Sequence, residues 1–126
     1  MLQLIFHLIG DYILQSDWQA NTKTSKNGPA LIHAILYSAL FSFIASPKAL
    51  VIIGVTHFLI DRFRLARYVV FAKNFLAPKS EWPNWYNCSS TGYPSERPAW
   101  LAVWLLIIAD NTLHLTINYL AIYYLG

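Results

Sequence analysis

Residues 98–124 read PAWLAVWLLIIADNTLHLTINYLAIYY, an apolar stretch that is interrupted mainly around Asp110, Asn111 and His114. A helix of about 20 apolar residues is long enough to cross the hydrocarbon core of a bilayer. A stretch of this length can also accommodate some tilt. The sequence therefore predicts a membrane-spanning helix over residues 98–124.

Three further apolar segments precede this stretch, at about residues 1–19, 29–45 and 48–72, and residues 73–97 form a polar and aromatic loop. The whole chain is 56% hydrophobic and only 12% charged, whereas soluble domains carry about 25% charged residues. We therefore expect an all-α protein in which residues 1–126 form a single transmembrane domain of about four membrane helices. The lipid bilayer is its expected surroundings.

The basic residues predict an orientation for this bundle. Lys23 and Lys26 lie in the first loop, and six more basic residues lie between Arg62 and Arg97. With four spans, both groups fall on one side of the membrane, and Lys and Arg favour the cytoplasmic side. Both termini are therefore expected outside the cytoplasm. We read the net charge of +3 as a topology signal, and no nucleic-acid partner is expected. The sequence does not indicate an oligomeric state.

A short chemical pattern recurs in three of the apolar segments. His7 and Asp11 are four residues apart, His57 and Asp61 repeat this spacing, and Asp110 and His114 show it reversed. Residues four apart lie on one face of a helix. Because acids make up about one residue in twenty, a given histidine has roughly a one-in-ten chance of an acidic neighbour at this spacing. Three of the four histidines have one, so coincidence is a poor explanation.

Ionisable groups inside a span cost at least about 2.5–3.5 kcal/mol each and normally face the bundle interior. Imidazoles and carboxylates on facing helices are the ligands that a divalent metal needs in a helical bundle. Because Cys88 is the only cysteine, a Cys-rich zinc site is excluded, and the absence of thiolates argues against copper(I) and iron–sulfur clusters. Imidazole and carboxylate suit zinc, manganese or iron, and zinc is the expected cofactor. The candidate metal ligands are His7, Asp11, His33, His57, Asp61, Asp110 and His114. They are enough for one ion or for two.

The predicted activity is that of a metal-dependent hydrolase acting on a lipid or a phosphate-bearing substrate. Asp11, Asp61 and Asp110 are the candidate catalytic carboxylates, as ligands, as orienting groups or as the base that activates a metal-bound water. Two alternatives stay open. The same groups could serve proton- or ion-coupled transport, or the pairs could be hydrogen-bonded glue between helices. Lys23 and Lys26 are most simply topology determinants, although a basic rim could also hold a phosphate.

The ordered set of these motifs resembles a known family. It comprises residues 7–15 (HLIGDYILQ), His33, residues 56–61 (THFLID) and the Asp110/His114 pair. The family is an uncharacterised group of bacterial and phage membrane proteins, number 3307 among domains of unknown function. Residues 87–111 look particularly like phage-encoded members, although members usually carry Gln where Asn111 stands. The resemblance covers nearly the whole chain. It implies a location in the bacterial inner membrane and no established activity.

Overall fold

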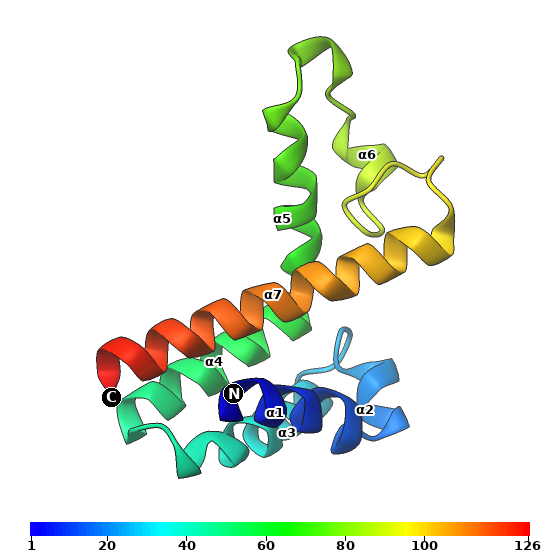
Figure 1. The fold of residues 1–126 in the computed structure, drawn as a ribbon. Helices are drawn as coiled ribbons and strands as arrows, with labels where there is room; N and C mark the ends of the chain where they lie inside the picture. Colours follow the sequence, from blue (N-terminus) through cyan, green and yellow to red (C-terminus); the bar gives the residue numbers. More distant parts are fainter. The chain divides into compact units, whose positions relative to one another are not determined.

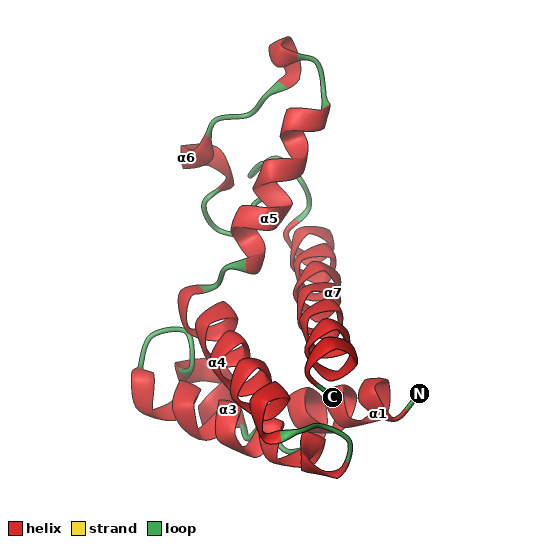
Figure 2. Cartoon of the chain, turned by 90° about the vertical axis from the view of Figure 1, so that its left-hand side faces the viewer, coloured by secondary structure: helices red, strands yellow, loops and turns green.

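The computed structural model describes residues 1–126 and contains helices and loops but no strand (Figures 1 and 2). This confirms the all-α class. The helices are α1 (Leu2–Leu8), α2 (Asp17–Thr22), α3 (Asn27–Leu40), α4 (Pro47–Phe63), α5 (Ala66–Ala72), α6 (Trp85–Cys88) and α7 (Ala99–Leu125). A π-helical turn at Ile9–Ile13 continues α1, and single 3₁₀ turns lie at Phe41–Phe43, Lys73–Leu76 and Lys79–Glu81.

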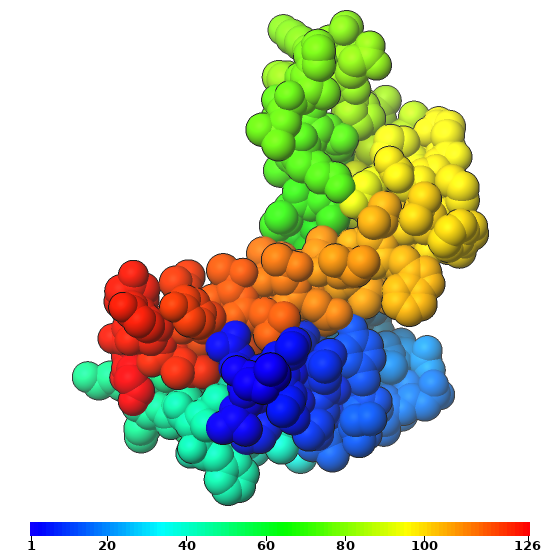
Figure 3. Space-filling view, in the orientation of Figure 1, coloured from blue at the N-terminus to red at the C-terminus, as the bar shows by residue number.

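The chain divides into two compact units. Unit 1 comprises residues 1–63 and 114–126, and unit 2 comprises residues 64–113. Helix α7 is continuous, so its first part belongs to unit 2 and its last twelve residues belong to unit 1. Within unit 1 the N-terminal residues pack against the end of α7 (Figure 3). The Gln3 side chain donates a hydrogen bond to the Leu115 carbonyl there, at 2.6 Å.

The first apolar segment does not form one helix over residues 1–19. The backbone leaves the helix after the π-helical turn, and Ser16 starts α2 as an N-cap. Ser16 and Gln19 form a capping box, in which each side chain bonds to the other residue's backbone N–H. A Ser with Gln three residues later is a known signal for a helix start, and it lies within the predicted helix.

The segment at residues 48–72 is also divided. Helix α4 ends at Phe63, and Arg64 has a φ of 52°, in the left-handed region that non-glycine residues rarely adopt. The Arg64 guanidinium donates to the Ser90 carbonyl at 2.5 Å within unit 2. This contact helps to hold the unusual backbone. Helix α5 then begins at Ala66.

These breaks change the membrane prediction. One helix, α7, is long and apolar enough to cross a membrane. The helical run Leu2–Ile13 is shorter, and α3 and α4 have 14 and 17 residues. A bundle with four complete spans is therefore not supported. The prediction for residues 98–124 agrees closely with α7.

The apolar core of unit 1 lies between α3 and α4, which run side by side (Figure 2). Its fully buried members are Tyr37, Phe41, Ala49, Ile53 and, from α7, Ala121. The Tyr37 ring also packs onto the π-helical turn at Gly10. A Cβ added to Gly10 would lie 2.5 Å from Cδ2 of Tyr37, so only glycine allows this close approach.

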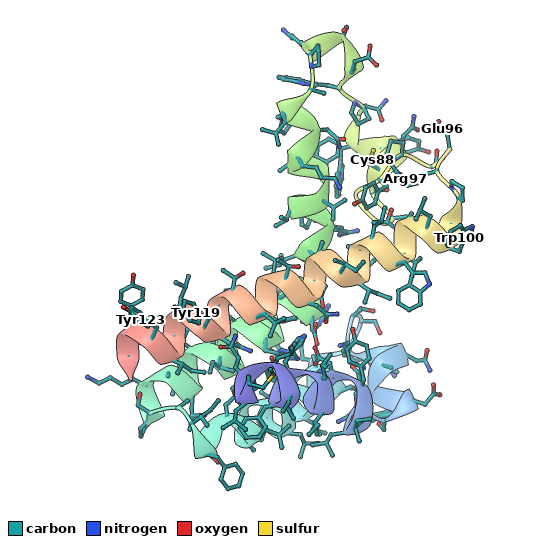
Figure 4. All side chains as sticks on the ribbon, viewed as in Figure 1. Cys88, Glu96, Arg97, Trp100, Tyr119 and Tyr123 are labelled. Carbon is teal, nitrogen blue, oxygen red and sulfur yellow. The ribbon has the colours of Figure 1, made fainter.

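Unit 2 has its own small core of Val70, Tyr93 and Ala102. Gly92 has a φ of 86°, and a Cβ there would meet the Arg67 carbonyl. The Arg67 guanidinium donates to the Ser89 carbonyl at 2.8 Å. Cys88 is buried near the loop that carries Glu96 and Arg97 (Figure 4). Burial, and next the charge of Glu96, raise the pKa of the Cys88 thiol.

The contact between Gly10 and Tyr37 predicts the effect of a single methyl group. Gly10→Ala should lower the free energy of unfolding by about 1–3 kcal/mol, because the added Cβ overpacks the Tyr37 ring. Gly28→Ala is the matched control, because a Cβ at this other helical glycine meets no atom within 4 Å. Thermal unfolding of both variants in detergent is the measurement. Equal melting temperatures for the two variants would contradict the packing described here.

Candidate metal centre

Six buried side chains from five elements converge inside unit 1. They are His7 from α1, Asp11 from the π-helical turn, His33 from α3, His57 and Asp61 from α4, and His114 from α7. None exposes more than 7% of its surface. The His7/Asp11 and His57/Asp61 pairs are therefore buried, as the sequence predicts, whereas Asp110 of the third pair is partly exposed.

The π-helical turn gives Asp11 its place. It lies one residue after Gly10, in a turn whose ladder is wider than that of an α-helix. Single π-helical turns are rare and occur frequently at functional sites. Both Gly10 and Asp11 are buried. Apart from Gly10, no residue pattern predicts this turn.

Four donor atoms form the centre of the cluster. His33 Nε2 lies 3.0 Å from His57 Nε2. Oδ1 of Asp11 lies 3.2 Å from His33 Nε2 and 3.3 Å from His57 Nε2. Oδ2 of Asp61 lies 3.3 Å and 3.2 Å from the same two nitrogens. We refer to these four atoms as the cage.

The distances between the cage atoms can be compared with the spacing of ligands around a metal ion. Ligands at about 2.0–2.1 Å from a tetrahedral zinc ion lie about 3.3–3.4 Å from one another. The five cage distances that involve an imidazole nitrogen, 3.0–3.3 Å, are close to this spacing. Hydrogen bonds alone explain them less well. A neutral imidazole nitrogen carries at most one hydrogen, yet His33 Nε2 has three cage atoms within 3.3 Å.

One cage atom also lacks a hydrogen bond of good geometry. Oδ1 of Asp11 is buried and has no hydrogen-bond partner, although two imidazole nitrogens lie close to it. A buried polar group without a partner carries a desolvation penalty of about 1–3 kcal/mol. A cation between these donors would satisfy the oxygen. The donor set of two imidazoles and two carboxylates suits zinc, manganese or iron.

Tyr37 holds the histidines in place. Its ring stacks on that of His57, with centroids 3.7 Å apart and planes 18° from parallel. Its hydroxyl lies 2.7 Å from His7 Nδ1 and accepts a hydrogen bond from the Asn118 amide at 2.6 Å. Nδ1 of His57 has no hydrogen-bond partner, so stacking, and not the usual outer hydrogen bond of a metal ligand, orients this ring.

The carboxylates have outer partners as well. Oδ1 of Asp61 lies 3.4 Å from His114 Nε2. Nζ of Lys23, at the end of α2, lies 2.7 Å from Oδ2 of Asp61. Oδ2 of Asp11 lies 3.6 Å from His7 Nδ1. These contacts orient the carboxylates toward the cage.

Of the seven predicted ligands, Asp110 is the one that falls in unit 2. It is partly exposed and lies four residues before His114 on α7. Residues at this spacing share a helix face. Its role as a ligand or a catalytic carboxylate stays a prediction.

Sequence reasoning missed three residues of the site. Tyr37 follows His33 by four residues, and Asn118 follows His114 by four residues. The i,i+4 pattern would have found both, had it been extended from acids to other polar partners. The sequence predicts Lys23 as a topology determinant or as part of a basic rim, but not as a partner of Asp61, because that contact spans 38 positions in the sequence.

Comparison with known proteins supports the family resemblance. The family described as "Protein of unknown function (DUF3307)" has a sequence model that matches residues 1–125. The chain belongs to the DUF3307 family. No curated protein and no solved structure matches it. Its buried His/Asp groups could hold a metal ion.

The cage predicts that metal content depends on single ligands. Asp61→Asn keeps the shape of the side chain but removes its charge, so the affinity for zinc should fall about tenfold or more. The His57→Ala variant should lose zinc as well. Both effects are measurable by elemental analysis of DUF3307 protein purified in detergent without chelators.

Asp17→Asn is the control for these variants, because Asp17 is an exposed acid on α2, away from the cage. It should retain the zinc of the wild type. If Asp61→Asn also retained full zinc while melting at the wild-type temperature, Asp61 would be removed from the site.

Proposed function

We propose that this protein is a membrane-embedded, metal-dependent hydrolase whose divalent ion binds in the cage. The observation that carries the proposal is that two imidazole nitrogens lie 3.0 Å apart and that a buried oxygen of Asp11 and one of Asp61 each lie 3.2–3.3 Å from both. In this proposal Asp11, His33, His57 and Asp61 hold the ion. Zinc is the preferred ion because it combines imidazole and carboxylate ligands in a tetrahedral shell.

The proposal also accounts for the charges in the site. Asp11 and Asp61 are buried carboxylates, and Lys23 is the one ammonium in contact with either of them. Buried charges are costly unless they are paired or coordinate a metal. A divalent ion compensates both carboxylates at once. If the His/Asp pairs only formed hydrogen bonds between helices, the negative charges of the two carboxylates would be less fully compensated.

Hydrolysis requires an activated water molecule and a group that accepts its proton. An ion held by Asp11, His33, His57 and Asp61 would supply the activation of water. In this proposal His114 accepts the proton. Its ring centroid is 4.2 Å from that of His57, and its potential ligand atom lies within 4.8 Å of those of Asp11 and His57.

The distribution of apolar side chains supports a location in the bilayer. Unit 1 buries four histidines, two aspartates and Asn118, while large apolar side chains on all its helices are exposed, such as Ile35, Val51 and Leu120. This inverts the usual arrangement of a soluble protein. Only 11% of the most apolar 18-residue window of α7 is buried, unlike the core helix of a soluble domain.

Residues at the two ends of α7 support an orientation. Five basic residues lie between Arg64 and Arg97, before α7, and none follows. Trp100 is exposed near its start, and Tyr119 and Tyr123 stack with ring centroids 5.7 Å apart near its end (Figure 4). Basic residues favour the cytoplasm, and Trp and Tyr favour both interfaces. We propose that the C-terminus lies outside the cytoplasm of a bacterial inner membrane.

Reporter fusions test this orientation directly. A periplasmic reporter after Gly126 should be active, because α7 would have crossed the membrane, and a cytoplasmic reporter inserted near Ser89 should be active as well. The protein should also stay with the membrane fraction after washing at alkaline pH. Release by that wash, or the opposite reporter pattern, would refute the membrane part of the proposal.

A second test separates hydrolysis from ion translocation. A hydrolase should contain one equivalent of tight metal and should act in detergent without a gradient. Its activity should disappear on chelation and return with zinc. A translocator should instead show a flux in proteoliposomes that follows a pH or ion gradient.

His33→Ala and Asp17→Asn form the matched pair for that test. His33 contributes a cage atom, whereas Asp17 is exposed on α2. Only the first variant should lose metal. Gradient-driven flux by a metal-free wild-type protein would overturn the hydrolase proposal in favour of transport.

A further inference from the structure

Lys23 is the most exposed group in contact with the cage. Its Nζ lies 2.7 Å from Oδ2 of Asp61, and its side chain is 16% exposed, whereas that of Asp61 is 4% exposed. The histidines of the cage are 1% exposed. Lys23 therefore lies between the buried donors and the surface. A ligand entering along this side meets its ammonium first.

The loop that carries Lys23 is fixed to α4. Nε of Arg62 donates to the Asn27 side chain at 2.7 Å, and its Nη1 donates to the Thr24 carbonyl at 3.0 Å. Arg62 directly follows Asp61 on α4. The same turn of this helix therefore contributes one cage atom, from Asp61, and the hydrogen bonds of Arg62 to the loop. The backbone of Lys23 also bonds to Gln19 at the end of α2. The position of Lys23 is therefore fixed by its own backbone hydrogen bond to α2 and by the hydrogen bonds of Arg62 to the loop that follows it.

Lys23 adds a positive charge beside the proposed ion. A divalent ion (+2) would be balanced by the carboxylates of Asp11 and Asp61 (−2), and the Lys23 ammonium lies 2.7 Å from Asp61. The Arg62 guanidinium, which is bonded to the same loop, adds further positive charge. Lys is a common ligand for phosphate, which it binds as a point charge. A phosphoryl group can offer one oxygen to the ion and another to the ammonium.

We propose that Lys23 binds the phosphoryl group of the substrate, so that the enzyme is a phosphatase acting on a phosphate ester. This inference rests on the proposed metal centre. In the structure the Lys23 ammonium pairs with Asp61, and in this proposal it donates to a non-bridging phosphoryl oxygen of the bound substrate. The ester can belong to a lipid headgroup or to a water-soluble molecule, because the phosphoryl chemistry is the same.

The reaction balances without another reactant. The oxygen of water forms a bond to phosphorus, and the bond from phosphorus to the ester oxygen breaks, with its electron pair going to that oxygen. His114 accepts a proton from the water and returns it to the leaving oxygen. The products are an alcohol and inorganic phosphate. Lys23 stabilises the negative charge on the phosphoryl oxygens during transfer.

The test measures binding of inorganic phosphate to the zinc-loaded protein by calorimetry. Removing a charged hydrogen-bond partner in Lys23→Gln should weaken phosphate binding about tenfold or more. Lys23→Arg keeps the charge and should bind phosphate within about threefold of the wild type. Lys26→Gln is the matched control, since Lys26 lies on the same loop but is exposed, and it should change binding less than about twofold.

Metal content and melting temperature separate this role from a structural ion pair. Lys23→Gln should keep its zinc or bind it more tightly, because it removes a cation that competes for Asp61. A variant that lost zinc and stability together would show a structural role and would overturn the proposal. Phosphate affinity unchanged by Lys23→Gln in a zinc-replete protein would also overturn it, leaving the metal centre intact. A wild-type protein without zinc would instead reject the metal centre.

Competition distinguishes the source of the phosphoryl group. Displacement of bound phosphate by dihexanoyl phosphatidic acid at lower concentrations than by glycerol 3-phosphate would support a lipid substrate. The reverse order would support a water-soluble one. Displacement by acetate as readily as by either ester would overturn the assignment to phosphoryl groups.

Discussion

The structure depends on one electrostatic constraint, which is the burial of two carboxylates among four imidazoles. Asp11 and Asp61 sit inside unit 1 with almost no exposure to solvent. Charge in such surroundings has to be compensated locally. Other features of unit 1 support this arrangement. The π-helical turn contains Asp11, and the Tyr37 ring stacks on His57. Lys23, at the end of α2, contacts Asp61. A metal ion bound by these His and Asp groups would compensate the two carboxylates.

Much of this centre could be predicted from the sequence. The i,i+4 spacing predicts that His7 and Asp11, and likewise His57 and Asp61, lie on one face of a helix. Because charge in contact with lipid is costly, this face is predicted to point into the interior of the protein. Both arguments are local, and both agree with the structure. The length and apolar composition of residues 98–124 likewise predicted α7.

The rest depends on interactions that a linear pattern does not contain. The apolar segment at residues 1–19 breaks because Ser16 and Gln19 cap a new helix, and the segment at 48–72 breaks where Arg64 takes a left-handed conformation. Hydrophobicity alone does not report either break. The partnership of Lys23 with Asp61 joins residues far apart in the chain, so it appears only when α2 and α4 are placed together.

The most direct test of the central claim is X-ray absorption spectroscopy of the zinc-loaded protein. The cage predicts four nitrogen or oxygen ligands at about 2.0–2.1 Å, with the outer-shell scattering of two imidazoles and no sulfur. A spectrum with only oxygen neighbours and no imidazole scattering would place the ion outside the cage. That result would contradict this account of the site.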